Sequence, residues 1–302
     1  MHAPNKMKHN NTKKTIVETS RRDEKSREFH FTEKDFERVS KLIYDHAGIS
    51  LSDSKQELVY SRLSRRLRAT GIDTFDDYLA YLESDTSGNE WEAFTNSLTT
   101  NLTSFFREGH HFPILAEHLL KMKGKHSSPV TIWCSASSTG EEPYSIAMTA
   151  VDAFNSFKPP VTILATDLDT KVLEAAKAGV YAEERVAKLD PALVKRFFLR
   201  GTGSHAGHVR VRQELRDMIT FRQLNLLDNN WPIRPPLDVI FCRNVMIYFD
   251  KPTQFAILKK FVPLLHNDGL LFAGHSESFY HAEELFKLRS KTVYELARKN
   301  KA

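Results

Sequence analysis

The chain of 302 residues has only two cysteines and no long apolar run, and both absences exclude classes of protein. No stretch approaches the roughly 18 consecutive apolar residues of a membrane-spanning helix, so we expect none. The basic N-terminus is followed by no apolar segment, which argues against a secretory signal. Cys134 and Cys242 lie in apolar segments typical of buried strands, and ligands are too few for a disulfide framework or a zinc site. The sequence therefore predicts a cytoplasmic protein without a structural metal.

Charge is distributed unevenly along the chain. Residues 1–28 carry a net charge of +4 and few apolar residues, so we interpret them as a disordered basic tail. A solvated tail is the simplest interpretation, and contact with nucleic acid or a membrane surface is the alternative. Residues 29–100 carry a net charge of −5. The overall pI near 9.0 is therefore a poor guide to the partners of the folded part.

Residues 29–95 have the pattern of a small helical domain. Thr32 and Asp35 resemble a capping box at the start of the first helix, which is expected to end at Gly48. Further helical patterns cover residues 54–70, 74–82 and 90–98. This domain is expected to contain helices alone.

From residue 96 to residue 302, apolar strands alternate with helices, which predicts an α/β domain whose parallel sheet is covered on both faces. The predicted strands are VTIWC (130–134), VTILAT (161–166), ITFRQLNL (219–226), DVIFCR (238–243) and GLLFAG (269–274). The C-terminal FKLRSKTVYELAR (286–298) has the pattern of two strands around a turn. We expect it to add an antiparallel edge to the sheet.

One stretch interrupts this alternation. Residues 191–224 contain a turn at Gly201-Thr-Gly203, followed by HVRVRQ, in which apolar and polar residues alternate strictly. We interpret the stretch as a small antiparallel β subdomain inserted in the larger domain. It could simply cover the sheet, or it could bind a partner.

The loop after the first strand, SASSTG with Glu141 and Glu142, indicates the kind of ligand. Ligands of open α/β sheets bind at the carboxyl ends of the strands, and small residues allow a close approach to the backbone. The G-x-G-x-x-G of a dinucleotide fold is absent, and two carboxylates at a helix N-terminus would repel a pyrophosphate. They would attract a cation, and S-adenosylmethionine offers a sulfonium and an ammonium. One of the two glutamates is expected merely to cap the helix.

Two further polar residues follow neighbouring strands. Asp167 comes directly after the second strand, where an acidic side chain can hold both hydroxyls of a ribose. Asn225, at the end of the third strand, can read the edge of adenine because an amide both donates and accepts hydrogen bonds. Either residue alone could be an ordinary cap or loop residue. Beside the first loop, they favour a cofactor that contains adenosine.

Five motifs occur in order along the chain: NLTSFFREGHHF (101–112), ASSTGEEPYSIA (136–147), ATDLD (165–169), FCRNVMIYFD (241–250) and GLLFAGHSESF (269–279). Together they resemble the CheR family of chemotaxis receptor methyltransferases, and the resemblance runs from Phe29 to the C-terminus. It implies a helical N-terminal domain, a class I S-adenosylmethionine methyltransferase domain of Rossmann-like fold, and a β subdomain inserted in the latter. It also implies the reaction, in which glutamate side chains of receptors become methyl esters and S-adenosylhomocysteine is released without any metal.

The resemblance implies functional residues as well. The residues expected to bind the cofactor are Asn101, Thr103, Arg107, Glu142, Asp167, Asn225, Leu226, Arg243 and Asn244. Arg107 and Tyr248 are expected beside the reacting methyl group. A glutamate with a pKa of about 4.3 is already ionised at neutral pH and needs no general base. We therefore expect Arg107 to hold the substrate carboxylate and Tyr248 to position the sulfonium or donate from its hydroxyl, while the nearby histidines 110, 111 and 275 are structural.

Two surfaces are candidates for partners. Four arginines, Arg62, Arg65, Arg66 and Arg68, gather in YSRLSRRLRAT (60–70) within the acidic helical domain. A solvated helix face is the ordinary interpretation, but given the resemblance we expect them to dock the methylation helices of receptors. In some relatives the β subdomain binds a peptide at the end of the receptor tail, which would recruit the protein to membrane-bound receptor arrays. No motif for nucleic-acid recognition is present.

Other functions remain open from the sequence. A class I methyltransferase acting on RNA or on a small molecule would share the fold, and the basic tail favours RNA weakly. A non-catalytic sensor of S-adenosylmethionine would share the cofactor site but would not need Arg107 and Tyr248. A nicotinamide dehydrogenase disagrees with the missing glycines and the paired glutamates. The sequence specifies neither the receptors, nor the glutamates, nor the oligomeric state.

Overall fold

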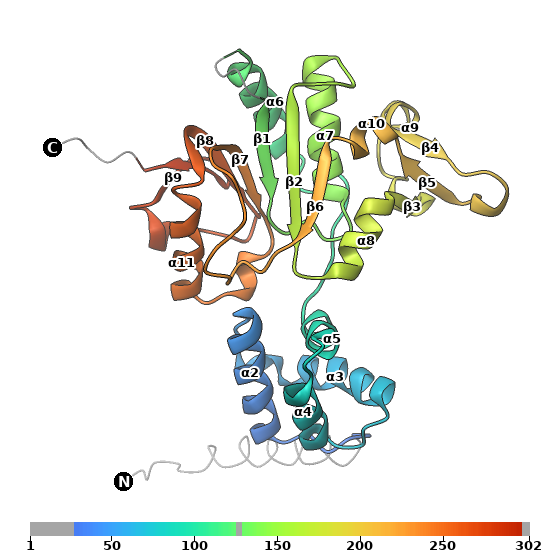
Figure 1. The fold of residues 1–302 in the computed structure, drawn as a ribbon, viewed down its shortest axis with the longest axis vertical. Coiled ribbons are helices and arrows are strands. Elements are labelled where there is room, and N and C mark those ends of the chain that lie inside the picture. Colours follow the sequence, from blue (N-terminus) through green and yellow to red (C-terminus); the bar gives the residue numbers. More distant parts are fainter. Residues whose placement is uncertain (1–26, 125–128, 298–302) are drawn as a thin grey trace, which may run out of the picture. The chain divides into compact units, whose positions relative to one another are not determined.

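The computed structural model describes residues 27–124 and 129–297. This part of the chain divides into two compact units, one of residues 27–46 and 51–100 and the other of residues 47–50 and 101–297. Figure 1 shows the helices of the first unit and the large sheet of the second. The predicted tail lies outside the described residues except for Arg27 and Glu28. These two residues form ion pairs within the first unit, with Glu57 and Arg68 respectively.

The first unit consists of helices in its described part. They are α2 (Glu33–Ala47), the short 3₁₀ helix η1 (Asp53–Lys55), α3 (Gln56–Thr70), α4 (Phe75–Ser84) and α5 (Asn89–Leu98). The predicted capping box is present, since the backbone N–H of Asp35 donates to Oγ1 of Thr32 at 3.2 Å and the N–H of Thr32 donates to the Asp35 carboxylate at 2.8 Å. Each partner satisfies an N–H group that the helix itself leaves unpaired.

The core of this unit comes from one apolar face of each helix. Val59, Leu63 and Leu67 recur at helical spacing on α3 and are fully buried. Val39 and Ile43 of α2 are buried to the same degree. The charged residues between them are left at or near the surface, where the four arginines of α3 lie.

The second unit is built on a sheet of seven strands in the order β6-β2-β1-β7-β8-β10-β9. The strands are β1 (Val130–Cys134), β2 (Val161–Asp167), β6 (Ile219–Gln223), β7 (Leu237–Cys242), β8 (Leu265–Ala273), β9 (Phe286–Ser290) and β10 (Val293–Leu296). The strands from β6 to β8 are parallel, and β10 and β9 form the predicted antiparallel edge. The chain runs outward from β1 to β2 and β6 and then returns to β7 on the other side of β1. Ligands of such sheets bind at this switch point.

Helices cover both faces of the large sheet. They include α6 (His111–Met122), α7 (Glu141–Phe154), α8 (Thr170–Ala178) and α11 (Lys251–Phe261). Along β7, Val239 and Phe241 belong to the apolar cluster that contains α6 and α7, whereas Ile240 and Cys242 belong to the cluster that contains α11. Burial on both faces explains why this strand has no polar alternation in the sequence. Across residues 27–124 and 129–297, no helix has both the length and the apolar character needed to cross a membrane.

The inserted subdomain contains a small antiparallel sheet in the order β3-β5-β4. Its elements are β3 (Val180–Ala182), η2 (Glu183–Arg185), α9 (Pro191–Phe197), β4 (Phe198–Arg200), η3 (Gly203–His205), β5 (His208–Val211) and α10 (Gln213–Arg216). Figure 1 shows it beside the β6 edge of the large sheet.

The predicted range of this subdomain, residues 191–224, differs from the structure at both ends. β3 lies before that range, and with three residues it is too short to show an alternation in the sequence. β6 lies inside the range but pairs with β2 in the large sheet. The separate prediction of a parallel strand at 219–226 agrees with β6, so the subdomain range extended too far at its C-terminal end.

Candidate active site

The predicted cofactor residues come from segments at the carboxyl ends of neighbouring strands. Asp167 is the last residue of β2, Asn225 follows β6, and Arg243 directly follows β7. The backbone N–H of Leu224 donates to the carbonyl of Asp167 at 3.0 Å, which holds the residues after β6 beside the end of β2. The fold therefore places these side chains along the side of the sheet formed by the carboxyl ends of its strands, here called the cofactor edge. The topology of the sheet predicts a ligand there.

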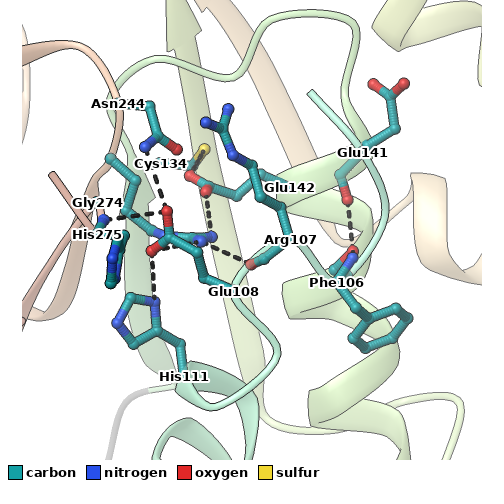
Figure 2. Close-up of polar contacts among 12 residues, drawn as sticks. Phe106, Arg107, Glu108, His111, Cys134, Glu141, Glu142, Asn244, Gly274 and His275 are labelled. Carbon is teal, nitrogen blue, oxygen red and sulfur yellow. Dashed lines mark hydrogen bonds and ion pairs between the residues drawn. The ribbon is translucent and has the colours of Figure 1, made fainter. Parts of the chain in front are cut away.

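The best-defined feature of this edge is a buried ion pair between Arg243 and Glu142, at the start of α7 (Figure 2). Nη1 of Arg243 lies 2.7 Å from Oε2 of Glu142, and only 1% of the Arg243 side chain is exposed. Nη2 donates to the carbonyl oxygen of Arg107 at 2.6 Å, and the thiol of Cys134 donates to Oε1 of Glu142 at 3.2 Å. Burial raises the pKa of Glu142, while the charge of Arg243 opposes that rise. Arg243 thus connects two of the predicted cofactor residues directly.

Glu108 joins the same cluster from the segment before α6. Its Oε2 lies 3.2 Å from Nη2 of Arg243. Its Oε1 accepts from the backbone N–H of His275 at 3.0 Å and from Nδ2 of Asn244 at 3.3 Å. Burial raises the pKa of Glu108, but the hydrogen bond from His275 and the charge of Arg243 outweigh it and leave the pKa below its ordinary value.

Glu277, like Glu108, was not predicted as a site residue from the sequence. Its carboxylate holds the two loops after β7 and β8 together. It accepts from the backbone N–H groups of Asn244 at 3.0 Å and Met246 at 2.8 Å, and also from that of Gly274. A Cβ at Gly274 would lie 2.4 Å from Nδ2 of Asn244, so only glycine fits there. Both Glu108 and Glu277 lie inside motifs that carry the family resemblance, but their roles depend on backbone groups far away in the chain.

Asp167 and Asn101 are linked through a second set of contacts. The N–H of Ser138 donates to the Asp167 carboxylate at 2.8 Å, and its hydroxyl donates to the carbonyl of Asn101 at 3.2 Å. Nδ2 of Asn101 donates to Asp169 at 3.1 Å. Burial raises the pKa of Asp167 to about 6. Thr103 lies partly buried in the same segment as Asn101, and Leu226 is buried beside Asn225.

The structure distinguishes Glu141 from Glu142. Glu141 is fully buried, accepts from the hydroxyl of Thr139 at 2.6 Å and pairs with Arg185 of η2. Figure 2 shows its carboxylate directed away from the Arg243 cluster. Gly140, just before it, has a left-handed φ of 97°, and a Cβ there would lie 2.9 Å from the Tyr181 hydroxyl. Glu141 is thus held by other protein groups, which leaves Glu142 as the glutamate at the predicted cofactor edge.

Residues expected near the methyl group occupy the loops of this edge. The guanidinium of Arg107 donates to the carbonyl of Leu102 at 2.8 Å and remains partly exposed. Tyr248 ends the 3₁₀ helix η4 (Met246–Tyr248) and is also partly exposed. His111 is buried, and burial lowers its pKa to about 4, so it is neutral at physiological pH. Its Nε2 lies 3.0 Å from the hydroxyl of Thr292, a structural contact.

Backbone strain is concentrated in these segments. Four residues here have a positive φ, a region that residues other than glycine rarely adopt. They are Phe106 (52°), Glu108 (55°), Ser138 (47°) and Asn244 (58°). Such conformations persist only where surrounding contacts enforce them, and they cluster at functional sites. Here the enforcing contacts include the hydrogen bonds of Glu108, Ser138 and Asn244 described above.

The four arginines of α3 differ in their surroundings. Arg62 donates to the carbonyl of Thr99 at 2.7 Å, which caps the end of α5. Arg66 forms a two-bond ion pair with buried Glu90, at 3.0 and 2.6 Å. Arg68 pairs with Glu28 at the surface. Arg65 is exposed on the same helix. The sequence pattern alone treats the four as one cluster, but two of them have clear roles inside this unit.

The residues at the sheet edge suit a cationic cofactor that contains adenosine. With both carboxylates ionised, Glu108, Glu142 and Arg243 together carry one net negative charge, which favours a bound cation. Asp167 places a buried carboxylate at the end of β2, and Asn225 places an amide in the segment after β6. Within the described ranges, no group of three or more His, Cys, Asp and Glu side chains is arranged to hold a metal ion.

This sheet order, with these residues at its switch point, defines a class I methyltransferase domain that binds S-adenosylmethionine. The chain belongs to the CheR methyltransferase family. The model of the family's SAM binding domain matches residues 101–295, and that of its all-alpha domain matches residues 34–99.

Relatives with established names support the assignment. A chemotaxis protein methyltransferase of Klebsiella aerogenes is 57% identical over 263 residues, which cover 87% of this chain and 89% of the relative. Chemotaxis protein methyltransferase 2 of Pseudomonas aeruginosa is 54% identical, over 89% of this chain and 95% of its own length. A chemotaxis protein methyltransferase of Escherichia coli is 54% identical, over 87% and 91% respectively.

Proposed function

We propose that this protein transfers the methyl group of S-adenosylmethionine to glutamate side chains of chemotaxis receptors and so forms glutamate methyl esters. The observation that carries the proposal is the match of both units to the CheR methyltransferase family. The names of relatives above 50% identity support chemotaxis receptors as the acceptor. The residues expected from the family resemblance at the cofactor site all belong to the second unit, which supports a complete site.

The cofactor residues have distinct tasks in this proposal. Asp167 accepts from the ribose hydroxyls, Asn225 and Leu226 contact the adenine, and Glu142 favours the cationic part of the cofactor. Asn101, Thr103 and Asn244 bind from the surrounding loops, and Arg243 holds Glu142 in place. When bound, S-adenosylmethionine supplies an electrophilic methyl group, and S-adenosylhomocysteine remains after transfer. No metal is required, because the positive sulfonium already activates the methyl group and the acceptor carboxylate is already ionised.

Arg107 and Tyr248 act on the substrate side. The acceptor glutamate is already ionised, so its activation consists of losing water and taking up an aligned position. Arg107 holds the carboxylate through its guanidinium. The ring or hydroxyl of Tyr248 positions the reacting methyl group. Neither residue has to move a proton, which agrees with the neutral, buried state of the adjacent His111.

We propose that α3 of the helical unit docks the receptor, and that only two of its four arginines contact the receptor directly. Arg65 is exposed, and Arg68 shares its charge with a surface glutamate, so these two are available to an acidic receptor helix. Arg62 and Arg66 contribute mainly by holding α5 and Glu90 in place. Replacing Arg65 with glutamate should therefore raise the KM for receptor without changing cofactor affinity.

The small sheet is proposed to bind the end of a receptor tail. Both β3 and β4 are edge strands of the order β3-β5-β4, so each can accept a further strand. Val180 on β3 and Leu199 on β4 are 44% and 48% exposed, which provides apolar contacts beside those edges. Such a tether would recruit the enzyme from the cytoplasm to receptor arrays.

The direct test is methyl transfer from radiolabelled S-adenosylmethionine to membranes that carry chemoreceptors, followed by a mild alkaline wash. Label that enters the receptor and leaves as methanol identifies a carboxyl methyl ester and supports the proposal. Binding of S-adenosylhomocysteine without receptor labelling would contradict it and favour another acceptor, such as RNA or a small molecule. A labelled product that resists base would exclude an ester.

A further inference from the structure

Glu108 makes contacts that no other carboxylate near the site makes. It lies one residue after Arg107 and contacts two separate segments: Arg243 and Asn244 after β7, and the backbone of His275 after β8. Figure 2 shows its side chain at the centre of these contacts. The backbone of Glu108 is left-handed, with a φ of 55°, and its side chain is directed into the cluster. Its hydrogen bond from His275 joins the loop after β8 directly to the segment of Arg107.

We propose that Glu108 is a positioning residue for methyl transfer, which fixes Arg107 relative to the loops after β7 and β8. This inference rests on the proposed function, because it assigns Glu108 a role in the same reaction. Glu108 does not itself touch the substrate. It acts through Arg107, whose carbonyl is already held by Arg243 at 2.6 Å.

The cofactor contacts should depend on Glu108 much less than Arg107 does. Arg243 keeps its ion pair with Glu142 at 2.7 Å when Glu108 is changed. The backbone of Asn244 keeps its hydrogen bond to Glu277 at 3.0 Å. The segment of Arg107, in contrast, loses the hydrogen bond that joins it directly to the backbone after β8. A small displacement of a substrate-holding group is enough to lower turnover strongly.

The test compares Glu108→Ala with Glu117→Ala in the full-length protein. Alanine removes the oxygen that accepts from His275 as well as the charge that faces Arg243. Glu117 is exposed on α6, so its replacement makes the same change of charge away from the site. Isothermal titration with S-adenosylhomocysteine counts cofactor-binding sites, and kcat for receptor methylation is expressed per site. We expect Glu108→Ala to lower kcat by about tenfold or more while the Kd for S-adenosylhomocysteine changes by less than about threefold. Glu117→Ala should match the wild-type protein in both quantities.

Several outcomes would overturn the inference. An unchanged kcat would show that Glu108 has no positioning role, and equal losses of kcat and cofactor affinity would make it a cofactor-binding residue instead. If Glu108→Ala binds no S-adenosylhomocysteine, Glu108→Asp, which keeps the charge, is measured in the same way and must show the same split between kcat and Kd. Wild-type protein that binds S-adenosylhomocysteine but labels no receptor would overturn the proposed function, whatever the variants do.

Discussion

Glu142 and Arg243 lie 101 positions apart in the chain, and their side chains meet at 2.7 Å within the candidate cofactor site. Glu142 starts the helix after β1 and Arg243 follows β7, so the pair spans the switch point of the sheet. The adjacent parallel strands β1 and β7 bring the two residues together. The pair therefore belongs both to the stability of the fold and to the site.

Replacing Arg243 by methionine should destabilise the protein by about 3–5 kcal/mol, because it leaves the buried carboxylate of Glu142 without its partner. Urea denaturation of the second unit measures the loss. Arg289→Met provides the control, since Arg289 is exposed on β9 and should change stability by less than about 0.5 kcal/mol. Equal effects of the two substitutions would contradict the assignment.

The affinity for cofactor should depend on pH through Asp167. Its pKa of about 6 in the folded protein lies above the ordinary value of 3.8, because burial disfavours the ionised form. Asp167 thus lowers the free energy of unfolding at neutral pH. This destabilisation disappears as the pH falls through about 6 towards 3.8. Binding of ribose hydroxyls needs the ionised carboxylate, so the affinity for S-adenosylhomocysteine should fall up to about tenfold per pH unit below that pKa.

Titration calorimetry between pH 5 and pH 8, on the order of one measurement per half unit, checks this prediction. Asp167→Asn should bind more weakly at pH 8 and should lose the dependence near pH 6 assigned to Asp167. A variant that keeps the full pH dependence would assign it to another group, with Glu142 the first candidate because burial raises its pKa as well.

Substitutions on the substrate side should separate turnover from binding. Arg107→Lys keeps the charge but loses the planar pair of donors, and we expect kcat to fall by about a hundredfold. Tyr248→Phe should lower kcat by about tenfold if its hydroxyl donates during transfer. The Kd for S-adenosylhomocysteine should stay within about threefold of the wild-type value for both. Parallel losses of kcat and affinity would place these residues in cofactor binding only.

Arg65 and Arg66 are adjacent in the sequence but should respond differently to replacement by methionine. Arg66 pairs with Glu90, whose side chain is 8% exposed and also accepts from the hydroxyl of Tyr78 at 2.8 Å. Arg66→Met should destabilise the helical unit by about 2–3 kcal/mol, because it leaves a buried carboxylate unpaired. Arg65→Met should change stability by less than about 0.5 kcal/mol. Hydrogen exchange of peptides from α3 and α5 measures both, and similar protection in the two variants would disprove the distinction.

Patterns among neighbouring residues predicted the helices and strands well, but they did not predict the contacts between residues distant in the chain. The capping box of Thr32 and Asp35 and the continuous apolar run of β7 follow from neighbouring residues, so both were evident in the sequence. β3 was missed because three residues show no period. The pairing of Arg66 with Glu90, 24 positions away, depends on how α3 packs against α5. Helical spacing shows that Arg66 flanks the buried stripe, but not which residue it meets.

The candidate site shows the same limit. The family resemblance supplied Arg107, Glu142 and Arg243 as separate residues, but their connection through one guanidinium comes from the order of the strands. Glu277 accepts from backbone N–H groups of two loops, and Glu108 accepts from the backbone of His275 and contacts side chains more than 130 positions away. Backbone groups have no signature in a sequence, and a local pattern does not show such distant partners. Only the motifs that contain these two glutamates could have directed attention to them.

The small sheet touches the cofactor edge as well as the solvent. The hydroxyl of Tyr181 on β3 donates to the carbonyl of Thr139 at 2.7 Å, and Arg185 of η2 pairs with Glu141 at the start of α7. The ring of Phe105, two residues before Arg107, packs edge-on against Tyr181 at 5.0 Å between ring centroids. An engineer who exchanges this insertion between relatives to change the recruiting peptide must therefore transplant these inner contacts with it. Otherwise the chimera would gain a new tether and lose the geometry of its catalytic loops.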